Sequence, residues 1–197
     1  MPSATLGSAQ LLSERIEALA ALTEVEGEIT RSYGTPSLAA ALELTESWMG
    51  EAELTVVRDP LGSLLGRIGP SEGPMLLLGS HIDSVRDAGR FDGPLGVLGP
   101  LAAIERTREQ LAGGDVAVGL LVFADEEGLR YRSSYLASRA CVGLFDEVEL
   151  AEEDDDGVPL AAAMRALGGD PDAACQPLLS AQDVLAYLEV HIEQGPV

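Results

Sequence analysis

The sequence contains no lysine, only two histidines and few aromatic residues. Its 12 basic residues are all arginine and stand against 33 acidic residues, which gives a formal net charge of -21 at pH 7. Nucleic acids and anionic membranes are polyanions, and a chain this acidic would be repelled by both. We therefore expect no nucleic acid and no membrane among the partners of this protein.

The sequence also lacks the features of a secreted or membrane-spanning protein. It has two cysteines, Cys141 and Cys175, without the Cys-x-x-Cys spacing of a thiolate site. Residues 1–5 lack the basic start and apolar run of a signal peptide. No apolar run approaches the length that spans a bilayer. These absences favour a cytoplasmic location.

Both histidines lie near carboxylates at the predicted ends of apolar strands. The apolar run 75–78 predicts a buried strand whose end delivers His81 into a cleft. Asp83 is offset from His81 along an extended chain, so we expect it to orient the imidazole, and Asp92 is the better candidate ligand. Taken alone, this stretch is explained about equally well by a polar loop with one satisfied histidine.

Two further clusters favour a metal site over that alternative. The apolar run 116–123 is followed by Glu126 and Glu127, whose carboxylates repel each other unless a cation neutralises them or a pKa shifts. Near the end of the sequence, the alternation of a predicted strand places His191 and Glu193 on one face. Scattered core histidines would show this arrangement only by coincidence, so the sequence predicts a metal centre.

Helical and strand patterns alternate along the rest of the chain. Helices are predicted over 8–23, 36–49, 94–111, 135–142 and 158–167, and a strand pair over 54–58 and 63–68. We expect the acidic stretch 147–156 to be a solvated loop, and Pro100 to kink its helix or delay its start. The order of elements predicts an α/β fold, a mostly parallel sheet with helices on both faces and a site at the carboxyl ends of the strands.

Four motifs carry a resemblance to a known family. GSHIDS, GRFDG, FADEEG and HIEQGP occur in this order between residues 79 and 196. They resemble the M20-type metal-dependent amidohydrolases, in the branch of N-carbamoyl-amino-acid hydrolases, β-ureidopropionases and allantoate amidohydrolases. HIEQGP and the DEEG box separate this branch from M20 aminoacylases and dipeptidases, and the resemblance runs from about residue 31 to the last residue.

The resemblance implies a site with two divalent ions, which could be Zn²⁺, Mn²⁺, Co²⁺ or Ni²⁺. It implies that Asp92 bridges the two ions and that His81 and His191 hold one of them. Glu127 would hold the other ion, and Glu126 would be the general base that activates a water. This water would attack a ureido or amide carbonyl of a small-molecule substrate.

The resemblance gives two more residues supporting roles. Glu193 would support the site from behind the ligands. Gln194 would hydrogen-bond the substrate, although a strand-end glutamine that satisfies a loop explains this residue nearly as well.

The same resemblance implies that residues 1–197 are the N-terminal part of a single metallopeptidase-like catalytic domain. The lid and dimerisation domain, and a later histidine for the second ion, are not in this sequence. Only one ion site is fully supplied, so we expect this chain alone to be inactive. The resemblance also implies that the whole protein is a homodimer.

Three functions remain open. The first is a hydrolase for linear amide or ureido C–N bonds, of the N-carbamoyl amino acid, β-ureidopropionate or allantoate type. The second is another M20 aminoacylase or peptidase. The third is a non-catalytic metal-binding chain from a truncated gene, which the missing later histidine motivates.

Overall fold

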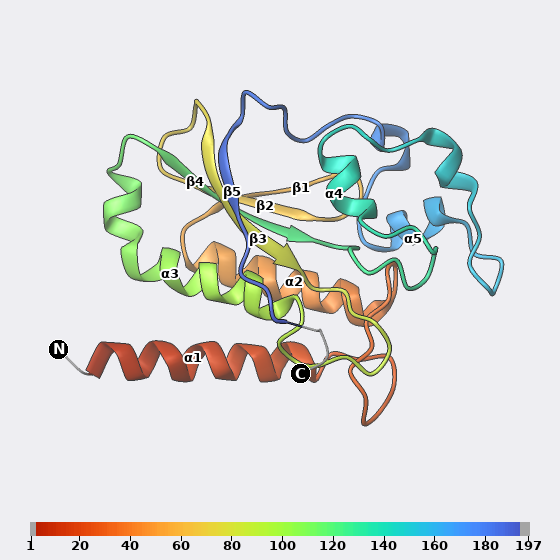
Figure 1. Ribbon diagram of the computed structural model, residues 1–197, viewed down its shortest axis with the longest axis horizontal. Coiled ribbons are helices and arrows are strands. Elements are labelled where there is room, and N and C mark those ends of the chain that lie inside the picture. Colours follow the sequence, from red (N-terminus) through yellow and green to blue (C-terminus); the bar gives the residue numbers. More distant parts are fainter. Residues whose placement is uncertain (1–2, 194–197) are drawn as a thin grey trace.

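The computed structural model describes residues 3–193, in which five strands form one mixed sheet in the order β1-β2-β4-β3-β5 (Figure 1). The strands are β1 (Thr55–Arg58), β2 (Leu64–Ile68), β3 (Met75–His81), β4 (Ala117–Phe123) and β5 (Val184–Leu188). β2 is antiparallel to both of its neighbours, whereas β3 is parallel to β4 and to β5. Since β1 and β4 both run opposite to β2, the four strands β1, β3, β4 and β5 point in one direction. This common direction confirms the predicted mostly parallel sheet.

Helices cover both faces of this sheet, as predicted, but they do so unequally. The α-helices are α1 (Ser3–Ala20), α2 (Pro36–Glu51), α3 (Pro94–Ala112), α4 (Leu136–Cys141) and α5 (Leu160–Ala166). α2 and α3 pack on one face, and α1 lies outside α3 (Figure 1). On the opposite face, Cys141 of α4 and Leu179 pack with Leu77 and Leu121 in a smaller hydrophobic cluster. Within residues 3–193, none of the helices combines the length and apolar character needed to cross a membrane.

The two long helices on the main face begin where the sequence predicts. The N-cap Thr35 accepts a hydrogen bond from the Leu38 N–H at 3.4 Å, and Pro36 occupies the first turn of α2. α3 begins at Pro94 and continues through Pro100 to Ala112, so the start of the helix is not delayed. Pro100 removes one backbone hydrogen bond without ending the helix.

β3 and β4 lie at the centre of the sheet and position the candidate site. Six of the seven residues of β4 are buried, which is the pattern of a strand covered on both faces. The two strands run parallel in a register that pairs His81 with Phe123. Residues that follow these strands therefore emerge side by side at one edge of the sheet.

The acidic stretch 147–156 is largely exposed, as predicted, but it is not a loop throughout. It begins with a 3-10 helix, η1 (Glu147–Ala151), which Asp146 caps by accepting the Val148 N–H. Glu149 is only 8% exposed and forms an ion pair with Arg139 at 2.5 Å. The prediction was wrong for Glu149 because its partner Arg139, on α4, lies outside the acidic stretch.

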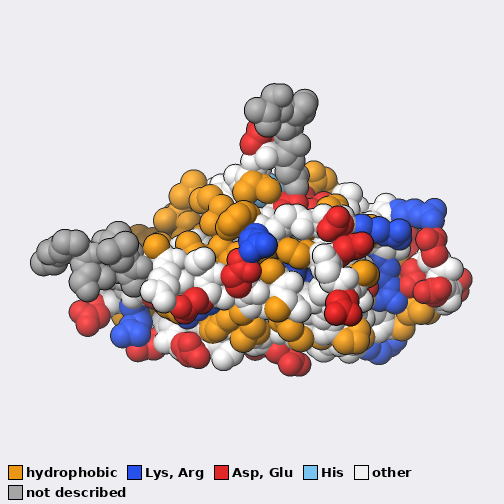
Figure 2. Space-filling model, turned by 90° about the horizontal axis from the view of Figure 1, so that it is seen from below, with side chains coloured by type: hydrophobic (Ala, Val, Ile, Leu, Met, Phe, Trp, Pro, Cys, Tyr) orange, Lys and Arg blue, Asp and Glu red, His pale blue; other side chains and the backbone are white. Residues whose placement is uncertain are grey.

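Charged side chains are scattered over the molecular surface. Figure 2 shows acidic and arginine side chains interspersed with apolar ones on the face turned toward the viewer. The acidic side chains visible on this face are therefore spread out, and water and salt screen their repulsion.

Asp59 is a buried carboxylate in the turn between β1 and β2. Its Oδ1 accepts the N–H groups of Leu61 at 2.9 Å and Ser63 at 2.8 Å. Burial raises the pKa of Asp59 to about 6, although these hydrogen bonds act in the opposite direction. Since the ordinary pKa of an aspartate is about 4, the folded state binds an additional proton between about pH 4 and about pH 6.

We predict that Asp59 contributes stability that is full below about pH 4 and is lost as the pH rises through about 6. Asp59→Asn keeps an oxygen for both N–H groups and does not ionise. Between about pH 4 and about pH 7, its free energy of unfolding should therefore fall by about 2 kcal/mol less than that of the unaltered chain. Urea unfolding across this range measures the difference, and parallel curves for the two proteins would contradict the prediction.

Candidate metal centre

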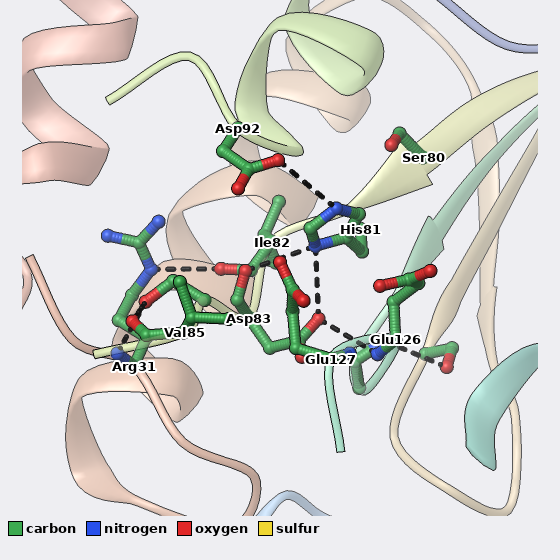
Figure 3. Close-up of polar contacts among 12 residues, drawn as sticks. Arg31, Ser80, His81, Ile82, Asp83, Val85, Asp92, Glu126 and Glu127 are labelled. Atoms are coloured by element: carbon green, nitrogen blue, oxygen red, sulfur yellow. Dashed lines mark hydrogen bonds and ion pairs between the residues drawn. The ribbon is translucent and has the colours of Figure 1, made fainter. Parts of the chain in front are cut away.

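Four segments bring the predicted site residues together at the carboxyl edge of the sheet. His81 ends β3, Glu126 and Glu127 follow β4, and Asp92 lies just before α3. Figure 3 shows Asp92, Glu126 and Glu127 around the His81 imidazole. His191 reaches the same place from beyond β5, and its ring stacks on that of His81 with centroids 5.6 Å apart.

The hydrogen bonds of the two imidazoles define which ring nitrogen faces the site. His81 Nδ1 lies 3.1 Å from the Asp83 carbonyl oxygen and 3.3 Å from Asp83 Oδ1. His191 Nδ1 lies 3.0 Å from the Ile192 carbonyl oxygen. These oxygens are acceptors, so Nδ1 carries a proton in each ring and Nε2 is the nitrogen that faces the site.

Asp92 completes a group of three convergent ligand atoms. The two Nε2 atoms lie 3.4 Å apart, and Asp92 Oδ1 lies 3.4 Å from His191 Nε2 and 4.0 Å from His81 Nε2. Ligand atoms of a tetrahedral site with bonds of about 2.1 Å are separated by roughly 3.4 Å. The separations in this group therefore fit a bound divalent ion.

A second candidate group shares His81 with the first. It contains His81, Glu126 and Glu127, whose ligand atoms also lie within 4.8 Å of one another. The family resemblance implies that Glu127 shares an ion with Asp92, whereas this group places Glu127 with His81. Both groups combine imidazole nitrogen and carboxylate oxygen, a donor set that suits Zn²⁺, Mn²⁺, Co²⁺ and Ni²⁺.

The buried Asp83 side chain contacts three of the predicted site residues, which are His81, Glu126 and Glu127. In addition to facing His81 Nδ1, its Oδ1 accepts the Glu126 N–H at 3.1 Å and its Oδ2 accepts the Glu127 N–H at 3.0 Å. Asp83 is fully buried, so its two oxygens have no competing solvent. Its position is that of a residue that orients ligands, which is the role expected for it.

The site attracts positive charge. Burial lowers the pKa of His81, but its hydrogen bond to Asp83 and the negative charges of Asp83, Glu126 and Glu127 outweigh burial and raise this pKa to about 9. Burial also raises the pKa of Glu126 and of Glu127, while His81 acts in the opposite direction. A cation at this position would relieve the mutual repulsion of these carboxylates.

Two buried ionisable residues next to the site were not predicted from the sequence. Burial, followed by the neighbouring charge of Asp83, raises the pKa of Asp125 well above its ordinary value. Arg31 is also buried, and its guanidinium donates to the carbonyl oxygen of Ile82 at 2.9 Å (Figure 3). It also donates to the carbonyl oxygen of Leu19 at 2.8 Å. Asp125 was visible as the residue before the glutamate pair, whereas no local signal marked Arg31.

The last part of the chain departs from its predicted conformation. β5 ends at Leu188, so the prediction of a strand through His191 and Glu193 was wrong, and residues 189–193 are irregular. Glu193 is exposed and belongs to neither of the two candidate ligand groups in the described part of the chain. Gln194 lies outside the described residues, and its predicted substrate contact remains a prediction.

Two cavities open from the candidate site. The smaller one, of about 200 Å³, is lined by Glu126, Glu127, Ser134, Tyr135 and His191. The larger one, of about 1030 Å³, shares Glu126 and His191 with the smaller cavity and extends over apolar residues such as Leu77, Leu121 and Val184. The carboxylates therefore face a space that a small molecule can enter.

Known proteins similar to this chain include two curated enzymes and one solved structure. The chain is 39% identical over 173 residues to an N-carbamoyl-L-amino acid amidohydrolase of Geobacillus stearothermophilus, which covers 87% of this chain and 42% of that protein. It is 32% identical over 189 residues to an allantoate deiminase of Arabidopsis thaliana, which covers 93% of this chain and 36% of that protein. A crystal structure of a hydantoinase/carbamoylase family amidase from Burkholderia ambifaria matches with a TM-score of 0.82 at 29% identity, over 96% of this chain and 46% of that one. No protein-family model matches the chain.

The chain therefore has the α/β fold of this amidase structure. By sequence it is a homologue of proteins named N-carbamoyl-L-amino acid amidohydrolase and allantoate deiminase, so the resemblance predicted from the four motifs is confirmed. The chain spans less than half the length of the relatives described above.

Gly93 generates a prediction about how the site is held. Its φ is +78°, and a Cβ at this position would lie 2.5 Å from the His81 carbonyl oxygen and 2.7 Å from His81 Nδ1. Gly93→Ala should therefore destabilise the fold by about 2–4 kcal/mol, the sum of a left-handed backbone and an overpacked contact. It should also displace His81 and weaken Zn²⁺ binding.

Gly89→Ala is the matched control, because a Cβ at Gly89 meets no atom within 4 Å. Urea unfolding and Zn²⁺ titration of the two variants measure both effects. Equal stability and equal Zn²⁺ affinity of the two variants would contradict the described packing of Gly93 on His81.

Proposed function

We propose that the protein containing this chain hydrolyses a C–N bond of a linear ureido or amide compound, of the N-carbamoyl amino acid, β-ureidopropionate or allantoate type. The observation that carries the proposal is the convergence of His81, Asp92 and His191 on one point, with the Glu126 carboxylate beside it. The names of the relatives, which are N-carbamoyl-L-amino-acid amidohydrolases and allantoate deiminases, support the substrate class.

The proposed ligands are His81, Asp92 and His191 for one divalent ion, with Glu127 contributing to a second ion that Asp92 would bridge. When bound, the ions would polarise the scissile carbonyl and lower the pKa of the attacking water. The buried Asp92 carboxylate and the two Nε2 atoms that face it support this assignment.

Glu126 is the proposed general base. Hydrogen bonds hold the backbone of Glu126 on both sides, since its N–H donates to Asp83 and its carbonyl oxygen accepts the Tyr135 N–H at 2.8 Å. This backbone position places the Glu126 carboxylate beside the proposed ligands. Burial raises the pKa of Glu126, which makes its carboxylate a stronger base. In the proposed reaction, Glu126 takes a proton from the water that attacks the carbonyl carbon and delivers it to the leaving nitrogen as the C–N bond breaks.

The products follow from this bond cleavage. An N-carbamoyl substrate and one water would give the free amine and carbamic acid, which separates into ammonia and carbon dioxide. The smaller cavity, lined by Glu126, Glu127, Ser134 and Tyr135, offers polar groups to a planar ureido group.

The remaining properties that the family implies are part of the same proposal. We propose that two ions are bound, that residues 1–197 form the N-terminal part of a single catalytic domain, and that this part alone is inactive. Glu193 would support the site from behind the ligands, and Gln194 would hydrogen-bond the substrate. The whole protein would act as a cytoplasmic homodimer.

Glu126→Gln in the whole protein tests the proposed base. The variant keeps the size and a hydrogen-bonding oxygen of Glu126 but does not accept the proton, so kcat should fall by about 10²–10⁴-fold while ion binding is retained. Glu127→Gln is the matched control and should instead lower the content of bound ions. Ammonia release from N-carbamoyl amino acids and from allantoate, together with metal analysis, measures both effects.

A comparison with N-acetyl amino acids distinguishes the alternatives. Turnover of N-acetyl but not N-carbamoyl substrates would replace the proposal by an aminoacylase. Unchanged kcat in Glu126→Gln would exclude Glu126 as the base.

A further inference from the structure

His191 reaches His81 from an edge strand that has already left the sheet. The backbone pairing of β3 with β5 ends at Leu78 and Leu188, three residues before each histidine. β3 remains paired with β4 as far as His81, whereas residues 189–193 are irregular. Backbone pairing therefore holds His81 in place, and other contacts must hold His191.

A side-chain bridge spans this unpaired stretch. The Ser80 hydroxyl donates to Glu189 Oε1 at 2.5 Å, directly before His81 in the chain. The Tyr187 hydroxyl lies 2.9 Å from Glu189 Oε2 and 3.1 Å from the Gly79 carbonyl oxygen, and it donates its single proton to one of them at a time. The Glu189 carboxylate thus joins the end of β3 to the end of β5.

Close backbone packing holds the same segment from the other side. A Cβ on Gly96, in the first turn of α3, would lie 2.4 Å from the Val190 carbonyl oxygen and 2.5 Å from Ser80 Cβ. Figure 1 shows the chain leaving β5 and passing beside β3 toward the start of α3. The backbone of Val190, the residue between Glu189 and His191, therefore lies close against the first turn of α3.

Both oxygens of Glu189 are engaged by this bridge. Glu189 also belongs to neither of the candidate ligand groups found among the described residues. Its contacts point to support of a ligand rather than to binding of an ion. Residues of this kind typically change metal affinity by 10–100-fold when they are removed.

We propose that Glu189 is a positioning residue, which bridges Ser80 and Tyr187 and thereby holds His191 Nε2 against His81 and Asp92. The inference rests on the proposed function, because His191 needs this position only as a ligand. It adds to that function a residue outside the proposed ligand set on which the affinity of the ion depends.

Titration of the metal-free protein with Co²⁺ tests the proposal, with the visible absorption of the bound ion as the readout. Glu189→Ala removes both arms of the bridge, so it should weaken Co²⁺ binding by about 10-fold or more and change the absorption spectrum. Glu189→Gln keeps an oxygen acceptor for Ser80 and should restore part of the affinity. Tyr187→Phe removes one arm and should give a smaller loss.

Glu72→Ala is the matched control, because it removes the same charge from an exposed residue ahead of β3. It should leave the affinity and the spectrum unchanged. The double variant Ser80→Ala and Glu189→Ala should bind Co²⁺ about as weakly as Glu189→Ala alone, since both changes break one bridge.

Two kinds of result would overturn the proposal, and they are distinguishable. If Glu189→Ala lowers only the urea stability of the metal-free protein and keeps the Co²⁺ affinity and spectrum, the bridge is structural and the positioning role fails. If the unaltered protein binds no Co²⁺, the proposed ion site fails together with the inference.

Discussion

The site depends on one buried carboxylate, that of Asp83, which joins the ends of two adjacent parallel strands. It faces His81 Nδ1 at the end of β3 and accepts the N–H groups of Glu126 and Glu127 after β4. Parallel register alone would bring these residues to one edge without orienting them. Asp83 orients the His81 ring and the start of the glutamate segment at the same time, so a proposed ligand and the proposed base share one support.

This arrangement gathers negative charge where water does not reach it. Asp83, Asp92 and Asp125 are all buried at this edge of the sheet. Burial and the charge of Asp83 raise the pKa of Asp125, which favours its neutral form, and the buried guanidinium of Arg31 opposes the charge of Asp83. Behind His81, the fold therefore opposes the build-up of negative charge by burial and by an arginine. On the side that faces the cavities, Asp92, Glu126 and Glu127 would be balanced by bound cations.

The sequence predicted the parts of the site that local pattern determines. Apolar runs that end in chemically distinctive residues were enough to place His81, Glu126 and Glu127 at strand ends, and the motif resemblance supplied their expected roles. The sequence did not reveal Arg31, Glu189 or the pairing of Arg139 with Glu149, because each of these contacts joins segments whose proximity depends on the fold. The alternation around His191 predicted a longer strand, since a period of two does not show where a neighbouring strand stops pairing.

The fold holds the proposed ligands to different degrees, and this difference bears on the affinity for an ion. His81 and Asp92 are buried between the sheet and the start of α3, whereas the His191 side chain is 35% exposed on an irregular segment beyond an edge strand. An ion gains affinity from each ligand only to the extent that the ligand is already in place, because ordering a mobile ligand uses part of the binding free energy. In the proposed site, the affinity for an ion would therefore be determined mainly by the least supported ligand, His191, and by the contacts that hold residues 189–191 beside β3 and α3.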